Sequence, residues 1–346
     1  MDFELSEEEV ALGESVRALC AARFPLEALQ QAASLTAARP AGRVEGGGSS
    51  STFDRKGWAA LASSGVFALQ VPEADEGVGL GMAPATVVFE ELGRALVPGP
   101  LVSTHLAARE ASAAFSGADE GKVVVGSIGR PPASGPEALP PLIVGHLANL
   151  DVLAVVSDGG IEVVEPSSLQ ASQIERSLDP LTPMWRVDQL PAGESIGDSN
   201  AAARWRRDES VLVAALLVGL AARCVEMAVQ YAKEREQFGR PIGSFQAVKH
   251  ICADMLVRAE TARVAVQAAA LTVDQPDVGD AERAAAGAAL LSAEAAQANA
   301  KACIQVHGGM GFTWEVPVHL YLMRARVLAE SLGPRGALAE LVADRY

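Results

Sequence analysis

The feature that most constrains the fold is a series of long alanine-rich segments that fills the second half of the chain. Alanine has the highest helix propensity, and its small side chain lets neighbouring helices approach closely. Larger apolar residues, such as Leu290, Leu291 and Ile304, lie among the alanines. The pattern predicts a four-helix bundle followed by a shorter helix, with the long helices at about residues 209–235, 245–274, 279–306 and 316–330.

The N-terminal third of the chain also has helical patterns. Ser6 and Glu9 stand at capping-box spacing, and the apolar side chains that follow recur every three or four residues. This predicts a first helix over about residues 6–22. Further helical segments lie at about residues 53–61 and 88–96.

Between these helical regions, short runs rich in valine and isoleucine predict β-strands. The runs cover residues 122–126, 142–144, 152–156 and 161–164. Asp158-Gly159-Gly160 predicts a hairpin turn between the last two. We therefore expect a mainly helical α+β fold of three domains: an N-terminal helical domain (1–116), a reduced β domain (117–200) and a C-terminal helical bundle (201–346).

Charge and cysteine spacing exclude several classes of function. The formal net charge of −15 repels phosphates, which argues against nucleic acid or an anionic membrane surface as a partner. Any anionic ligand must then bind a local concentration of arginine, lysine and helix N-termini. The four cysteines lack C-x-x-C spacing, so we expect neither a metal site nor a disulfide framework.

No membrane-spanning or secretory segment is expected from the sequence. The longest apolar run, residues 211–222, is shorter than the roughly 20 residues that a membrane-spanning helix needs. The first nine residues are acidic, whereas a secretory signal is basic and then apolar. These features predict a cytoplasmic protein.

Two polar, glycine-containing segments in the helical half carry groups suited to an anionic cofactor. Residues 235–246 begin R-E-Q-F-G-R-P-I and end F-Q, and residues 305–312 are Q-V-H-G-G-M-G-F. Arginine pairs with pyrophosphate, amides bond ribose or phosphate, and paired glycines let backbone N–H groups approach an anion. Taken singly, Arg235 is also a common helix-end cation and Gly308-Gly309 an ordinary helix C-cap. The occurrence of both segments in order favours the cofactor interpretation.

Together the two segments resemble the acyl-CoA dehydrogenase family of flavoenzymes. The resemblance implies that both lie in a C-terminal helical domain and reach across a subunit interface to hold the FAD of the neighbouring protomer. Matched residue by residue, it implies these cofactor-binding residues: Arg235, Phe238, Gln246, Gln305, Gly308 and Gly309. It assigns no role to His307.

The N-terminal half carries the same resemblance. The turn at residues 71–79 and the helix end at residues 88–96 are similar to the family's P-E-x-x-G-G-x-G turn and E-E-L-G-R-A helix end, although Asp75-Glu76 replaces an aromatic-glycine pair. The family's T-E-P-x-x-G-S-D segment and Trp-x-Thr strand, which pack on the flavin ring, have no match in the sequence. The resemblance therefore implies a truncated β domain.

Acyl-CoA dehydrogenation removes an α proton and a β hydride, so it requires a carboxylate base on one face of the substrate and FAD on the other. Most of the family carries the base on a loop where this sequence has Leu332, with Glu330 two residues away. The isovaleryl- and long-chain-like enzymes carry it on the first helix of the C-terminal domain, and this resemblance assigns the base to Glu209. A helix N-terminus there favours the carboxylate, and an apolar acyl chain opposite raises its pKa. The alternative is a first-turn acid on a solvated helix start.

The resemblance implies FAD-dependent α,β-dehydrogenation of an acyl-CoA thioester, with an electron-transfer acceptor, in fatty acid or steroid side-chain degradation. The similar bacterial steroid side-chain enzymes are heterotetramers of unlike subunits, so an α2β2 assembly is the first hypothesis. A non-catalytic subunit that completes the flavin site of a paralogous partner is the second, supported by Leu332 and the truncated β domain. A homotetramer, and the flavin monooxygenases and nitroalkane oxidases that share the fold, stay open.

Overall fold

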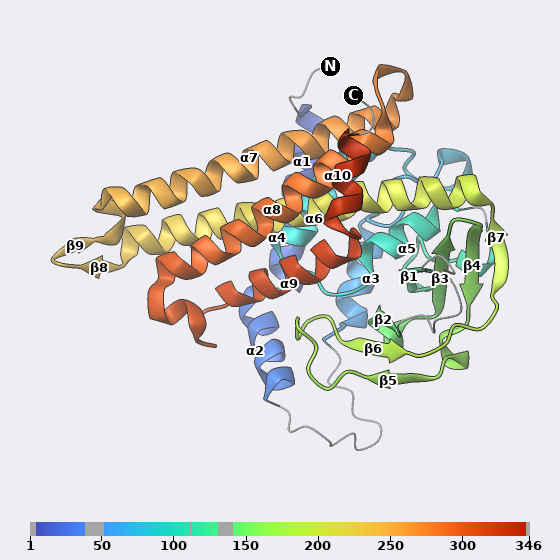
Figure 1. Cartoon of the computed structure of the whole chain (residues 1–346), viewed down its shortest axis with the longest axis horizontal. Coiled ribbons are helices and arrows are strands. Elements are labelled where there is room, and N and C mark those ends of the chain that lie inside the picture. The colour runs from blue at the N-terminus through green and yellow to red at the C-terminus, as the bar shows by residue number, and fades with distance from the viewer. Residues whose placement is uncertain (1–4, 39–51, 111, 131–140, 344–346) are drawn as a thin grey trace. The chain divides into compact units, whose positions relative to one another are not determined.

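The computed structural model describes residues 5–38, 52–110, 112–130 and 141–343, and contacts divide the chain into two compact units. The helical unit comprises Met1–Gln31, Met82–Val97 and Ser210–Tyr346. The mixed unit comprises Ala32–Gly81 and Pro98–Glu209. The boundary falls inside the longest helix, α6 (Ser199–Glu234), which is labelled with the other elements in Figure 1.

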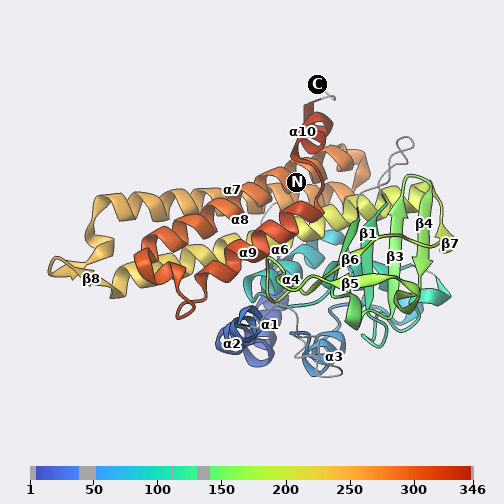
Figure 2. The same cartoon turned by 60° about the horizontal axis from the view of Figure 1, so that its bottom comes forward.

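The helical unit consists of long helices that run alongside one another. Figures 1 and 2 both show α7 and α8 side by side, with α9 packed on α8. The helices are α1 (Glu7–Arg23), α4 (Met82–Arg94), α7 (Gln246–Asp274), α8 (Ala281–His307), α9 (Val318–Ser331) and α10 (Arg335–Ala343). The part of α6 after Glu209 belongs to the same unit, and α2 (Leu26–Ala37) follows α1.

Two glycines let α4 and α6 cross at close range. A Cβ atom on Gly219 would lie 1.9 Å from the carbonyl oxygen of Glu90, and one on Gly93 would lie 2.1 Å from that of Leu216. Both distances are far below van der Waals contact, so a side chain at either position would force the helices apart. The crossing therefore requires glycine on both helices.

The fully buried Asn299 of α8 connects three helices. Its amide nitrogen donates to the carbonyl oxygens of Met255 on α7, at 2.8 Å, and Ala221 on α6, at 3.3 Å. Its side-chain oxygen accepts from Arg258 Nε at 3.0 Å. A buried amide that is satisfied in this way fixes how the helices are aligned.

The mixed unit contains two small sheets. The first has the strand order β1-β3-β4-β7, in which β1 and β3 are parallel and the other pairs antiparallel. Its strands are β1 (Val125–Gly129), β3 (Val152–Ser157), β4 (Gly160–Val164) and β7 (Glu194–Gly197). The second, antiparallel sheet contains β2 (Leu142–Gly145), β6 (Met184–Val187) and β5 (Ala171–Gln173). The unit also contains helices α3 (Arg55–Ser63) and α5 (Leu101–Ala108), the end of α2 from Ala32, and α6 up to Glu209.

The structure confirms the predicted mainly helical α+β fold. The four predicted strands correspond to β1–β4, with the hairpin turn at Asp158 and Gly159. The capping box of Ser6 and Glu9 begins α1 as expected. Helices α2 and α5 and strands β5–β7 are additional elements. The three-domain division at residues 116 and 200 stays a prediction.

The predicted start of one helix is wrong. α6 begins at Ser199, ten residues before the expected start. Asp198 caps it by accepting a hydrogen bond from the Ala201 N–H at 2.9 Å, and Trp205 is fully buried beside the Phe115 ring. The arginines on either side of Trp205 give the segment a loop-like, solvated composition, which concealed the helical pattern.

Among the described residues, α6 is the one helix long and apolar enough to cross a bilayer. Most of its apolar stretch is buried against the rest of the fold. Packing within the protein therefore accounts for its apolar character.

Candidate functional site

The first candidate cofactor segment forms a hairpin beyond the end of α6, where β8 (Glu236–Gln237) pairs with β9 (Arg240–Pro241). Arg235 closes its base: the Arg235 N–H donates to the Tyr231 carbonyl at 2.8 Å, and the Arg235 carbonyl accepts from the Ile242 N–H at 2.8 Å. Phe238 lies at the tip with a positive φ of 55° and is 92% exposed. The hairpin thus presents its tip to solvent.

The second segment, residues 305–312, begins in the last turn of α8, which ends at His307. Residues 308–312 form a short 3-10 turn, and Gly308 has a φ of 60°, a conformation that favours glycine. The His307 ring stacks on the Tyr231 ring, with centroids 4.2 Å apart. Because Tyr231 lies one helical turn before Arg235, this stack brings both segments to the same end of the helical unit, as Figures 1 and 2 show. We call it the cofactor end.

The candidate cofactor residues are exposed there: Arg235, Phe238, Gln246, Gln305, Gly308 and Gly309. A Cβ atom on Gly308 or Gly309 would meet no atom within 4 Å, so the backbone of this turn is open to a ligand. Gln246 is also the first residue of α7, where the helix N-terminus favours anions. A guanidinium and two amides fit the pyrophosphate and ribose groups of FAD, and the uncrowded Gly308-Gly309 turn leaves room for the ligand.

Aromatic side chains also face solvent at the cofactor end. Phe238 is 92% exposed, Phe312 80% and Trp314 40%. Phe238 meets Phe245 edge to face at 6.1 Å, and the Arg240 guanidinium lies 4.2 Å from the Phe245 ring centroid. An exposed patch of this kind is typical of an interaction surface.

Glu209, the candidate base, belongs to the mixed unit. It lies ten residues after the first residue of α6, so the expectation that it stands at a helix N-terminus is wrong, and the helix dipole has faded at this depth. The residue is half-buried, and Ser127 Oγ on β1 donates to its Oε1 at 2.6 Å. Burial raises the pKa of Glu209, and the hydrogen bond from Ser127 partly offsets that rise. The alternative of a solvated first-turn acid is therefore also wrong.

A buried charge network lies next to Glu209 in the chain. Asp208 is 2% exposed and accepts hydrogen bonds from Arg109 Nη2 at 2.5 Å and Arg207 Nε at 2.7 Å. Arg109 also donates to Gln70 Oε1 at 3.4 Å, and a His105 ring nitrogen lies 3.0 Å from the same oxygen. This network ties α5 to the first part of α6.

Leu332, where most of the family carries the base, directly follows α9. It lines a cavity of about 860 Å³ at α8, α9 and α10, together with Glu330 and Arg335. Arg335 pairs with Glu294 at 3.0 Å, and Glu330 is exposed. Glu330 therefore lacks the burial that distinguishes Glu209.

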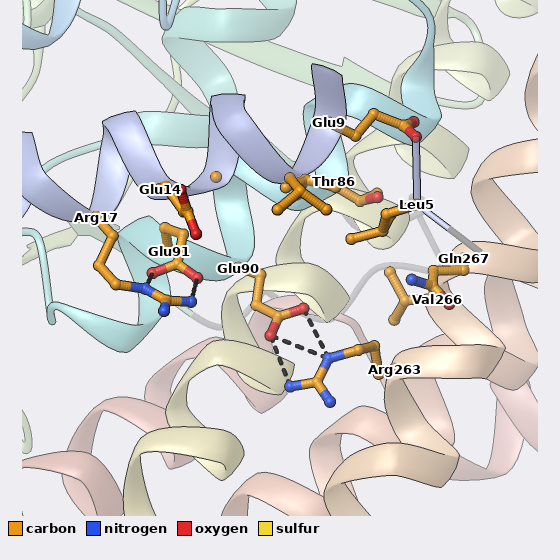
Figure 3. Close-up of a pocket in the computed structure, with 13 residues that line it drawn as sticks. Leu5, Glu9, Glu14, Arg17, Thr86, Glu90, Glu91, Arg263, Val266 and Gln267 are labelled. Carbon is orange, nitrogen blue, oxygen red and sulfur yellow. Dashed lines mark hydrogen bonds and ion pairs between the residues drawn. The ribbon is translucent and has the colours of Figure 1, made fainter. Parts of the chain in front are cut away.

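Another pocket contains none of the predicted site residues. It lies at α1, α4 and α7 with a volume of about 270 Å³, and Figure 3 shows two ion pairs in its wall. Arg17 binds Glu91 at 2.6 Å, and Arg263 binds Glu90 at 2.8 Å. These pairs join α1 and α7 to α4, which gives the pocket a structural explanation.

Three residues that shape the cofactor end or the surroundings of Glu209 were not predicted from the sequence. They are Tyr231, Ser127 and Ser103. Tyr231 has a usable signal, because it is an aromatic residue one turn before Arg235. Ser127 and its partner Ser103 have none, because their contacts join residues 82 and 24 positions apart.

Family models match both helical parts of the chain. The model described as "Acyl-CoA dehydrogenase, C-terminal domain" matches residues 207–346, and the one described as "Acyl-CoA dehydrogenase, N-terminal domain" matches residues 6–122. The C-terminal match includes Glu209 and all six candidate cofactor residues.

Individual relatives extend the match over the whole chain. Acyl-CoA dehydrogenase IpdE2 of Mycolicibacterium smegmatis is 34% identical, covering 99% of this chain and 100% of the relative. Acyl-CoA dehydrogenase FadE34 of Mycobacterium tuberculosis is 38% identical over 81% of this chain, which spans only 40% of that relative's length. A structure of the ChsE4-ChsE5 complex from Mycobacterium tuberculosis contains a chain with a TM-score of 0.82 and 23% identity, covering 100% of this chain and 98% of its own. That likeness shows the fold alone.

Proposed function

This chain belongs to the acyl-CoA dehydrogenase family, whose cofactor is FAD, and from that membership we propose that it acts in the α,β-dehydrogenation of an acyl-CoA thioester as one subunit of a heterotetramer. The observation that carries the proposal is the exposure of all six candidate cofactor residues at the cofactor end. In this proposal the six cofactor residues hold the FAD of a neighbouring subunit, as the family resemblance implies.

The partner in this proposal is an unlike acyl-CoA dehydrogenase subunit. Two structural neighbours are named for paired proteins: the ChsE4-ChsE5 complex and the Tcur3481-Tcur3483 steroid acyl-CoA dehydrogenase. The absence from this sequence of the family's flavin-facing β segments supports a second subunit that supplies them. We propose a cytoplasmic location, an electron-transfer acceptor, and a role in fatty acid or steroid side-chain degradation.

In the proposed reaction, Glu209 abstracts the α proton of the thioester. Burial makes its carboxylate a stronger base than an exposed one, because the ionised form is poorly solvated. Ser127 holds one carboxylate oxygen, Oε1, which limits the orientations of the group. Bound FAD supplies the acceptor for the β hydride. Arg235, Gln246, Gln305 and the Gly308-Gly309 turn bind the FAD of a neighbouring subunit.

The flavin-to-chain ratio, measured by absorbance, tests the assembly. We expect little flavin on the chain purified alone and about one FAD per pair of chains once an unlike partner is bound. One FAD per chain in isolation contradicts the heteromer and favours a homotetramer.

Turnover of the assembled complex tests the base. We expect Glu209→Gln to lower kcat by roughly 100- to 10,000-fold, the range typical of a lost general base. Glu330→Gln is the matched control and leaves turnover unchanged, because Glu330 is exposed.

A non-catalytic subunit that completes a partner's flavin site is the second candidate function. The apolar Leu332 at the usual position of the base favours it. If the Glu209→Gln complex keeps full turnover while the partner's own glutamate is essential, this second function replaces the first.

A further inference from the structure

Three side chains from three elements of the mixed unit form a continuous hydrogen-bonded chain that ends on Glu209. Ser103 Oγ of α5 lies 2.7 Å from Ser127 Oγ of β1, and Ser127 Oγ lies 2.6 Å from Glu209 Oε1 of α6. Ser103 is buried, and Ser127 is half-buried. The carboxylate of the proposed base is thus held by a hydroxyl that is itself hydrogen-bonded to a second hydroxyl.

The direction of these hydrogen bonds follows from donor and acceptor counts. An ionised carboxylate only accepts, so the single hydroxyl hydrogen of Ser127 is given to Glu209. Ser103 must then be the donor to Ser127. When Glu209 is protonated on Oε2, Oε1 still accepts from Ser127; when it is protonated on Oε1, the acid donates to Ser127 and both hydroxyls reverse. The same three groups therefore remain hydrogen-bonded in either protonation state.

The backbone around Ser127 is fixed by the neighbour of Ser103. The Thr104 hydroxyl donates to the Val125 carbonyl at 3.1 Å and accepts from the Val125 N–H at 3.0 Å. Val125 lies two residues before Ser127 on β1, so both side chains are on the same face of the strand. Consecutive residues of α5 thus hold β1 and its serine in place.

The three charged residues directly before Glu209 in the chain, residues 206–208, are engaged in ion pairs. Asp208 binds Arg109 and Arg207, and Arg206 pairs with Asp158 at 3.4 Å. His105 contacts the Val66 carbonyl and Gln70. Burial raises the pKa of Glu209, and the Ser127 hydroxyl lowers it.

We propose that Ser127, backed by Ser103, is a positioning residue that orients the Glu209 carboxylate and accompanies its gain and loss of a proton. The inference rests on the proposed function, since it assigns a partner to the proposed base. It also makes a separate claim about Glu209 in the full chain, independent of partner or flavin.

The test is the titration of the Glu209 carboxyl group in the full chain, followed by its infrared C=O stretch as the difference between wild type and Glu209→Gln. Ser127 stabilises the ionised form more than the neutral form, because hydrogen bonds to a charged acceptor are stronger. We expect Ser127→Ala to raise the titration midpoint by roughly half to one pH unit. Ser127→Thr, which keeps the hydroxyl, stays near the wild-type midpoint, and Ser103→Ala gives a smaller rise.

Ser172→Ala, an exposed serine on β5, is the matched control and leaves the midpoint unchanged. An unchanged midpoint in Ser127→Ala overturns the proposal. If Ser127→Ala fails to fold, Ser103→Ala is the deciding variant. It keeps the Ser127 hydroxyl but removes the hydrogen bond that Ser127 accepts, so Ser127 becomes a weaker donor to Glu209. An unshifted midpoint in Ser103→Ala then overturns the proposal.

Activity separates this inference from the function on which it rests. In the assembled complex, we expect the acid limb of the pH profile of kcat/KM to shift to higher pH in Ser127→Ala, by the same amount as the infrared midpoint. Full turnover of the Glu209→Gln complex contradicts the proposed base while the titration still reports on Ser127. An inactive Glu209→Gln complex with an unshifted Ser127→Ala midpoint contradicts the positioning role alone.

Discussion

The surroundings of Glu209 and the cofactor end differ in how completely one chain builds them. Around Glu209, Ser127 binds the carboxylate and the adjacent Asp208 is held by two arginines. At the cofactor end, Arg235 and the aromatic rings of Phe238 and Phe312 face solvent. The first region is organised by contacts within the chain, whereas the second, in the proposed function, completes its contacts with FAD and a partner subunit. Mutations should therefore affect stability in the first region and binding in the second.

The largest effect on stability is expected from Asp208→Asn. The change removes the buried negative charge that Arg109 and Arg207 share, and breaking one partner of a buried pair costs about 3–5 kcal/mol. The measurement is the free energy of unfolding in urea. Asp158→Asn is the control, since Asp158 is an exposed carboxylate paired with Arg206, and it costs less than about 1 kcal/mol. Equal losses in the two variants contradict the comparison.

A second prediction concerns pH and His105 of α5. Burial lowers the pKa of His105 from 6.5 to about 4, and the hydrogen bond to Val66 only partly opposes this. Between these values the unfolded chain binds more protons than the folded one, so the folded state gains stability as pH rises. The contribution is fully present above pH 6.5 and is lost as pH falls toward 4, a change of about 3 kcal/mol.

His105→Gln isolates this contribution, because glutamine stays neutral over the whole range. Urea unfolding at several pH values between 4 and 7 is the measurement. The gap in stability between wild type and variant should shrink on acidification. A gap that stays constant with pH contradicts the prediction, because it means that the titration of His105 does not change the free energy of unfolding.

Arg235→Ala should affect binding without affecting stability. The guanidinium is exposed, so we expect the free energy of unfolding to change by less than about 0.5 kcal/mol. A lost charge-assisted hydrogen bond to pyrophosphate weakens FAD binding by about tenfold to a hundredfold in the assembled complex. Fluorescence titration with FAD measures the effect, and Lys233→Ala, an exposed cation of the last turn of α6, is the control. Loss of stability in Arg235→Ala would argue for a structural role.

The position of the cofactor residues along the chain could be predicted from short sequence motifs. Arg235, Gln305 and Gly308 belong to short contiguous motifs, so their approximate place at helix ends was predictable. Their joint position was not, because it depends on the ring stack between Tyr231 and His307, 76 positions apart in the chain. Their solvent exposure likewise depends on the tertiary fold.

Glu209 shows the opposite case. Resemblance selected the residue, but the helix N-terminus that was expected to favour its ionised form is wrong, because α6 begins at Ser199. The actual causes, burial and Ser127, arise from contacts between distant segments. Helix and strand types followed from periodicity in most of the chain. The start of α6 could not be predicted from periodicity, because the buried Trp205 lies among arginines and the segment has no simple helical pattern.

The smallest effect sharpens the comparison at the cofactor end itself. Tyr231→Leu removes the ring that stacks on His307, and such aromatic pairs contribute about 0.5–1.5 kcal/mol beyond their buried area. We expect the unfolding free energy to fall by about 1 kcal/mol and FAD binding in the complex to weaken by about fivefold, because the two cofactor segments lose their alignment. Tyr231→Phe keeps the ring and should retain both properties. Calorimetric unfolding and flavin titration measure them separately. If Tyr231→Leu loses stability but binds FAD normally, then the two segments bind the cofactor independently, and the stack serves only the packing of α6 on α8.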